Sequence, residues 1–245
     1  MKIRAGWYMP IIPLTISTDQ YNYNIFTNAG SPGSICSVTL TVNTGVVVTQ
    51  LIDSAAGGWA VGSTLLIVNN GHIDGVGGNG GDGGAGSGGA GTGGSNGGRA
   101  IDTNHVNLAV SINNTNGYIF GGGGGGAGGA GNSSNYGGGG GGGRGSGLGG
   151  YKGGTTGGGT QATVGGDASF SAAGVHGTGS VYLGFGGEDG ADGGDWGAFG
   201  GDAPAYYGAP LRSGGGPGYA VYAYTGTLSW LGGNNGSQVK GSVRS

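Results

Sequence analysis

The sequence has 245 residues, of which 73 are glycine and only 8% are charged, and its formal net charge is -3. The eight basic residues are scattered, so no strongly positive surface is available for nucleic acid or anionic membranes. No apolar run approaches the roughly 20 residues that a membrane-spanning helix needs. We therefore expect no nucleic-acid partner and no membrane insertion.

The N-terminus resembles a secretion signal only in its first four residues, Met-Lys-Ile-Arg. The following stretch is interrupted by Pro10 and Pro13 and has no small-residue cleavage site. We expect synthesis in the cytoplasm without a signal peptide. Cys36 is the sole cysteine, which excludes an intrachain disulfide.

Residues 1–75 favour β structure and essentially no α-helix. Residues 38–42 alternate apolar and polar side chains, which is the period of a half-buried strand. A turn at 43–45 precedes a second apolar run from Val46, and residues 65–68 form a third. We interpret 1–75 as a mainly β attachment domain, 76–235 as a glycine-rich bundle, and 236–245 as a C-terminal tail.

One pattern recurs three times: a strand, an Asn/Gly turn and a short strand that runs into glycine. The copies cover 65–75, 110–121 and, more faintly, 221–232. They are too irregular for a solenoid of fixed period. We interpret them as hairpins that close a small sheet at the foot of each glycine segment.

The glycine segments predict an unusual architecture. Residues 76–98 hold 14 glycines in 23 positions, and 121–150 hold 20 in 30. Glycine costs backbone entropy and offers no side chain to bury, so this content indicates places where a Cβ would collide with a neighbour. In 76–85 the non-glycine residues fall at every third position, which matches an extended helix of three residues per turn.

An extended threefold helix has no internal hydrogen bonds, so its N–H and C=O groups must bond to parallel neighbours. A helix at the rim of such a bundle can keep side chains on its outer edge, as we expect for Asn79, Asp82 and Ala85. A surrounded helix must be glycine throughout, as in 121–126 and 137–143.

Collagen, disorder and a nucleotide-binding loop each account poorly for the glycine content. Collagen requires abundant proline and a strict glycine period, whereas this chain has six prolines and long glycine runs. Disorder conflicts with the interleaved β segments and aromatic residues. A nucleotide-binding loop would need a Gly-Lys-Ser/Thr signature and a following helix, and neither is visible.

The strand-to-glycine junctions and the segments 77–85 and 121–131 resemble the glycine-rich tail-fibre proteins of tailed phages. The nearest resemblance is to the receptor-recognising tip adhesins of T-even-like phages, and it covers roughly 65–235. It implies a polyglycine II helix bundle with distal receptor-binding loops and a separate segment that attaches to a trimeric tail-fibre protein through the N-terminal region. It also implies a place at the tip of the fibre on the virion.

The inserts between glycine runs are rich in aromatic residues, for which a bundle with glycine contacts has no core. Tyrosine and tryptophan offer large, rigid contact areas at low entropy cost, as binding loops require. About half of these aromatics could instead cap the bundle ends. The candidate receptor-binding residues are Tyr136, Tyr151, Lys152, Phe170, Tyr182, Phe185, Trp196, Phe199, Tyr206, Tyr207 and Arg212.

No arrangement of residues predicts catalysis, a metal or a cofactor. Asp189, Asp192 and Asp195 are three residues apart, about 9 Å along a threefold helix, which is too far for two of them to share one ion. We interpret them as a solvated acidic edge. Glu188 and a nearby aspartate could imitate a glycosidase pair, but no sugar cleft is indicated. We therefore expect no enzyme activity.

The leading hypothesis is a phage adhesin that binds an outer-membrane protein or a surface polysaccharide through loops at one bundle end. A purely structural fibre segment or connector is the alternative. An ice-binding protein is a third hypothesis, against which the bulky inserts argue because they interrupt any flat face.

Overall fold

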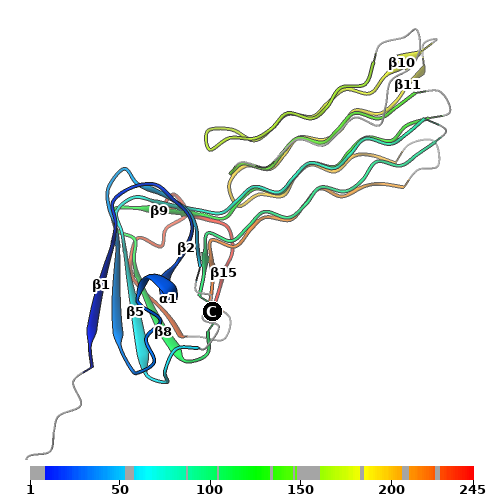
Figure 1. Cartoon of the computed structure of the whole chain (residues 1–245). Helices are drawn as coiled ribbons and strands as arrows, with labels where there is room; N and C mark the ends of the chain where they lie inside the picture. The colour runs from blue at the N-terminus through cyan, green and yellow to red at the C-terminus, as the bar shows by residue number, and fades with distance from the viewer. Residues whose placement is uncertain are drawn as a thin grey trace, which may run out of the picture.

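A computed structural model describes residues 9–52, 58–86, 88–103, 105–132, 135–145, 147, 161–182, 185–205, 210–223 and 227–245. The chain forms two parts (Figure 1): short strands gather at one end, and long glycine-rich segments run away from them side by side. We call these the β unit and the glycine unit, the latter comprising 76–98 and 121–218. The chain is mainly β, as expected, and α1 (Ile25–Asn28) is the only helix within the described ranges.

The first sheet of the β unit stacks strands that are far apart in the chain. Each neighbouring pair in it is parallel. Its strand order is β1 (Ile11–Ile16), β3 (Ser37–Val42), β5 (Ser63–Asn69), β8 (Leu108–Asn113) and β13 (Thr227–Gly232).

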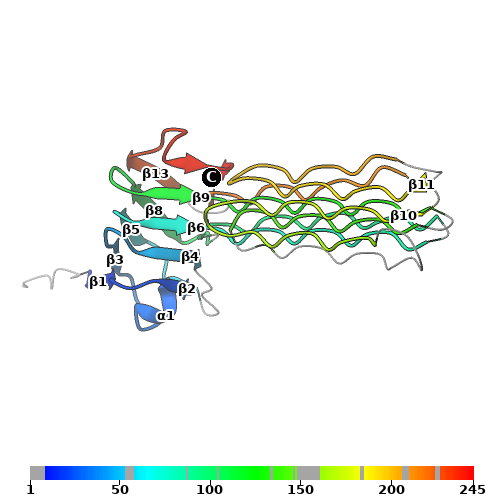
Figure 2. The ribbon, with the colours of Figure 1, turned by 90° about the horizontal axis from the view of Figure 1, so that it is seen from above.

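The second sheet lies beside the glycine unit and is parallel in the same way. Figure 2 shows β6 and β9 leading into the glycine unit. The strand order is β14 (Val239–Lys240), β9 (Tyr118–Phe120), β6 (His72–Asp74), β4 (Val47–Ile52), β7 (Ile101–Asp102), β12 (Val221–Tyr222) and β15 (Val243–Arg244). A further strand, β2 (Gln20–Asn24), also pairs with β4.

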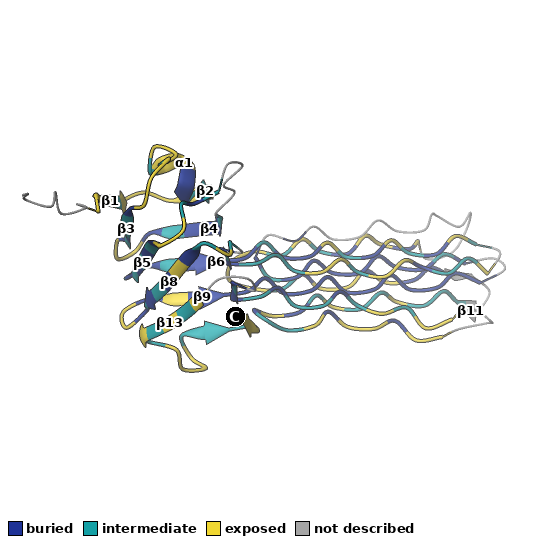
Figure 3. Ribbon diagram, turned by 90° about the horizontal axis from the view of Figure 1, so that it is seen from below, coloured by how far each residue is buried: buried dark blue, intermediate teal, exposed yellow. Residues whose placement is uncertain are grey.

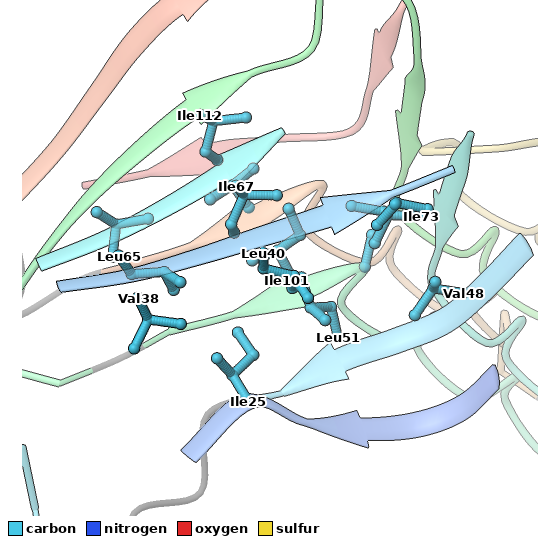
Figure 4. Packing of buried hydrophobic residues seen from close by; sticks show 14 of the residues in the cluster. Ile25, Val38, Leu40, Val48, Leu51, Leu65, Ile67, Ile73, Ile101 and Ile112 are labelled. Atoms are coloured by element: carbon cyan, nitrogen blue, oxygen red, sulfur yellow. The ribbon is translucent and has the colours of Figure 1, made fainter. Parts of the chain in front are cut away.

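The hydrophobic core fills the space between these two sheets (Figure 4). In β3 the buried and half-buried residues alternate, so Val38 and Leu40 point into the core and are fully buried. Leu51 and Ile101 meet them from the second sheet. Burying each such side chain contributes about 1.5–3 kcal/mol, so the alternating pattern is what holds the sheets together.

The three strand–turn–strand copies are not antiparallel hairpins, contrary to our interpretation. They stack in parallel, one above another: β5 lies on β8, which lies on β13, while β6 lies on β9, which lies on β14. The third copy also begins later than expected, because its first strand is β13 rather than 221–222. Residues 236–245, expected to be a tail, supply β14 and β15. The local sequence pattern identified the three copies, but it did not indicate that the strands of one copy pair with those of the next.

The glycine segments bond laterally to one another, as the sequence predicted. Three amides of the segment that follows β6 donate to carbonyls of the segment that follows β9, each at 2.8 Å and each three residues after the last. The pairs are Gly78 to Gly123, Gly81 to Gly126 and Gly84 to Gly129. The exposed residues Asn79, Asp82 and Ala85 each follow one of these bonded glycines directly, on the outer edge.

The segment 121–131 is surrounded by others, and Figure 3 shows buried segments inside the glycine unit with exposed ones outside. A Cβ on Gly123 would collide with the carbonyl oxygen of Gly194, and one on Gly126 with that of Ala191. A Cβ on Gly125 would instead collide with Asn79 O. Positions three apart therefore face the same neighbour, and a side chain on either face would force neighbouring backbone apart.

Candidate functional site

The end of the glycine unit remote from the sheets, which we call the loop end, holds turns fixed by buried asparagines. Asn132 and Asn135 are 5% and 1% exposed. The Nδ2 of Asn135 donates to Asn132 Oδ1 at 2.8 Å, and Asn132 Nδ2 donates to the carbonyl of Gly186 at 2.8 Å. These bonds tie the 132–135 turn to a segment more than fifty residues later in the chain, so the two are held in a fixed relation.

A short antiparallel hairpin lies at the loop end, formed by β10 (Val181–Tyr182) and β11 (Phe185–Gly186) (Figure 1). Ser180 anchors its base and is fully buried. The amide of Tyr136 donates to Ser180 Oγ at 2.7 Å, and the amide of Ser180 donates to Tyr136 O at 2.9 Å. These two bonds join the strand that leads into the hairpin, where the candidates Tyr182 and Phe185 lie, to the backbone of a third candidate, Tyr136.

The ring of Tyr136 is half-buried, and its carbons lie 3.4–3.5 Å from where a Cβ on Gly86 would stand. Tyr136 thus packs over the turn of the 76–98 segment, which is an ordinary van der Waals contact. This contact helps the ring to brace the loop end, so its exposed part is presented from a fixed backbone.

Arg212 lies at the neck of a second loop. It exchanges two backbone hydrogen bonds with Ala203, at 2.9 and 3.1 Å, which close the neck of 203–212. Its Nε is buried and has no hydrogen-bond partner among the described residues. Four other candidates, Tyr151, Lys152, Tyr206 and Tyr207, lie outside the described residues.

Three candidate aromatics lie away from the loop end: Phe170, Trp196 and Phe199. The segment 187–196 runs back toward the sheets, and the amide of Gly197 bonds to Gly121 O just beyond β9. Trp196 is therefore at the sheet end, only 6% exposed, with its ring 5.8 Å from Phe120 and 5.9 Å from Phe170. Phe199 is 73% exposed and follows Ala198, whose carbonyl accepts from Gly124. An aromatic residue in an insert does not reveal which end the insert occupies, so the sequence could not separate these residues.

Three aspartates of the glycine unit accept hydrogen bonds from donors of neighbouring segments. Asp189 Oδ1 accepts from Gly179 N at 2.8 Å, and Asp202 Oδ1 accepts from Gly214 N at 2.8 Å. Asp195 Oδ1 accepts from Arg144 Nη1 at 2.6 Å. Hence the acidic edge is not merely solvated, since it satisfies donors that the outermost segments leave free. Within the part of the chain that the structure describes, no three His, Cys, Asp or Glu residues gather as a metal site.

The fold is that of a phage fibre-tip protein. A solved structure, the crystal structure of the gp37-gp38 adhesin tip complex of the bacteriophage S16 long tail fiber, is similar to this chain with a TM-score of 0.57 and 22% sequence identity. The match covers 96% of this chain and 82% of that one. No curated protein sequence matches the chain.

The family model described as Phage tail fibre adhesin Gp38 matches residues 11–244, and the chain belongs to that family. It is therefore a phage tail-fibre adhesin, acting at the distal end of the fibre on the virion. None of the described residues forms a helix long and apolar enough to cross a membrane.

Proposed function

We propose that the loop end binds a receptor on the bacterial surface, either an outer-membrane protein or a surface polysaccharide. The observation that supports this most is the position of the β10–β11 hairpin and the 203–212 neck, at the end farthest from the sheets (Figure 1). Loops on a rigid support lose little entropy on binding. The contact residues of this proposal are Tyr136, Tyr151, Lys152, Tyr182, Phe185, Tyr206, Tyr207 and Arg212.

Binding of the purified protein to host cells tests this proposal. Replacing both Tyr182 and Phe185 with alanine should weaken cell binding about tenfold or more, because buried aromatic anchors dominate interfaces. Phe199→Ala is the matched control, since Phe199 is an exposed aromatic on the same unit but away from the loop end. Equal losses in both variants, or none in the double variant, would refute the assignment. A wild-type protein that binds no cells would favour the connector hypothesis.

We also propose that the glycine segments adopt the polyglycine II conformation. Lateral hydrogen bonds at every third residue support this, as do the faces of 121–131 on which positions three apart meet the same neighbour. Three residues per turn is the period of this helix. Backbone torsions of Gly123–Gly126 measured by crystallography should lie near φ about -75° and ψ about +145°. Torsions typical of a pleated sheet would contradict the proposal.

The β unit is proposed to attach the protein to a trimeric tail-fibre protein through its N-terminal region. The similar phage S16 structure is of a gp37-gp38 complex, and the β unit lies opposite the loop end. Ile11 of β1 is 66% exposed, as an apolar residue at an interface would be. Ile11→Asp should abolish copurification with the fibre-tip protein of the same phage, whereas Val164→Asp, at an exposed position of the glycine unit, should not.

The proposed activity is binding without catalysis and without a cofactor. The similarity to an adhesin complex and the bonding of the aspartates to backbone amides support this. Incubation with host polysaccharide should release no reducing ends; their release would show a hydrolase.

A further inference from the structure

A cavity of about 200 Å³ lies where the β unit meets the glycine unit. His72 and Asp74 of β6 and Phe120 of β9 form one side, and Arg144, Phe170 and Trp196 from three glycine-unit segments form the other. The cavity is therefore built by both units and lies far from the loop end. A receptor bound at the loop end would not occupy this cavity.

Asp74 is the carboxyl group that lines this cavity. It is 3% exposed, and its Oδ1 has no hydrogen-bond partner among the described residues. Its Oδ2 lies 4.0 Å from His72 Nδ1, which is too far for a hydrogen bond. Burial raises the pKa of Asp74 to about 7, although Arg144 nearby lowers it. A buried carboxyl oxygen left without a donor costs free energy, so a ligand that supplies a donor gains affinity.

The opposite walls of the cavity are aromatic. The centroid of the Trp196 ring lies 5.8 Å from that of Phe120 and 5.9 Å from that of Phe170. Phe170 is 42% exposed, so it borders the opening. Such rings offer flat apolar faces against which the C–H groups of a ring-shaped ligand can pack.

The charges around the cavity limit the ligand class. Arg144 Cζ is 5.4 Å from the centroid of Trp196, and Lys240 Nζ is 5.2 Å from that of Phe120, so the rings already face cations. An added cation would be repelled, whereas a wholly apolar ligand would leave Asp74 without a donor. A neutral ring that carries hydroxyl groups meets both requirements. The volume is below the roughly 300–1,000 Å³ of drug-sized sites, so it suits one ring rather than a chain of several.

We propose that this cavity binds a single neutral sugar residue, with a hydroxyl donated to Asp74 Oδ1 and the ring packed against Trp196 and Phe170. It is a second binding site, independent of the loop end. Chain-terminal sugar units of bacterial surface polysaccharides have the required chemistry.

Saturation-transfer NMR with the methyl glycosides of glucose, galactose, mannose and N-acetylglucosamine tests the proposal on the full chain. At least one glycoside should receive saturation, and a titration with that glycoside should give its dissociation constant. Asp74→Asn and Phe170→Ala should each weaken this binding about tenfold, because the first replaces the carboxylate with a weaker neutral acceptor and the second removes an aromatic face. Asp192→Asn, at an exposed carboxylate outside the cavity, should leave it unchanged.

Two results would overturn the proposal. One is the absence of saturation transfer to all four glycosides with the wild-type protein. The other is equal transfer in wild type and in both cavity variants, which would place any sugar elsewhere, for example at the loop end. Circular dichroism checks each variant for folding. Phe170 is partly exposed, so Phe170→Ala remains informative even if Asp74→Asn is poorly folded.

Discussion

His176 donates its backbone N–H to Asp192 Oδ1 at 2.8 Å, and its ring Nδ1 lies 2.7 Å from the same oxygen. Asp192 belongs to the segment after β11, and His176 belongs to the segment before β10. The carboxylate therefore takes the place of the carbonyl acceptor that a neighbouring segment would offer to the His176 amide. Asp189, three residues earlier, repeats this arrangement with Gly179 N as the donor, whereas Asp195, three residues later, accepts from the Arg144 side chain instead. Asp189 and Asp192 thus accept from the backbone amides of Gly179 and His176 in the neighbouring segment.

Asp192→Asn should reduce stability at neutral pH, and this loss should shrink in acid. The backbone hydrogen bond from His176, and then the bond from its ring, lower the pKa of Asp192. A lowered folded-state pKa stabilises the protein above the unfolded pKa of about 3.9, and that contribution disappears as pH falls through the folded value. The side chain is 61% exposed, so we expect under about 1 kcal/mol. Urea unfolding of both proteins at pH 7 and pH 3 measures it; a difference independent of pH would contradict the role.

Gly125→Ala should destabilise the glycine unit strongly. The new Cβ would overlap the backbone of Asn79, which cannot move without breaking lateral hydrogen bonds. Overpacking typically costs about 1–3 kcal/mol, and a clash with backbone belongs at the upper end of that range. Gly166→Ala is the control, because its Cβ would meet Val175 at 3.4–3.5 Å, an ordinary contact. Thermal unfolding should show a large fall in Tm for the first variant and little change for the second. Similar values for both would mean that the segments are not closely packed.

Features with a local sequence signal could be predicted, and features that depend on distant parts of the chain could not. The strands at 38–42 and 65–68 and the surrounded run at 121–126 were predictable, because alternation and unbroken glycine are local signals. Strand partners were not, because parallel pairing joins residues such as Leu65 and Val110 that are distant in the chain. The position of Trp196 at the sheet end could not be predicted either. It depends on the direction in which its glycine segment runs, and a glycine-rich sequence does not indicate that direction. Asp74 was missed because one buried carboxyl in a short strand has no sequence signature.

Asn114→Ala should destabilise the β unit, because Asn114 joins three stacked copies of the strand–turn–strand pattern. It is fully buried, accepts from Asn69 Nδ2 at 2.7 Å and donates to Gly233 O at 2.9 Å. Alanine would leave the carbonyl of Gly233 without this donor, at a cost of about 2 kcal/mol. Asn116→Ala removes only an exposed bond to Asn70 and should change stability by less than about 0.5 kcal/mol. Urea denaturation of both variants decides; equal effects would show that the buried asparagines do not couple the copies.

Asp74→Asn should stabilise the protein above pH 7 and lose that advantage toward pH 4. Burial, partly opposed by Arg144, raises the pKa of Asp74 from 3.8 to about 7. Since the folded state then binds the proton more tightly than the unfolded state, this group makes stability fall as pH rises from about 4 to about 7. Three pKa units correspond to about 4 kcal/mol, an upper value because asparagine also needs a partner when buried. The unfolding free energies of the two proteins at pH 4 and pH 8 give the difference directly, free of the opposite trends of Asp192 and Asp195. Equal unfolding free energies of Asp74→Asn and wild type at both pH values would mean that Asp74 is ionised and solvated in the folded protein. The cavity at the junction would then lack its unsatisfied acceptor.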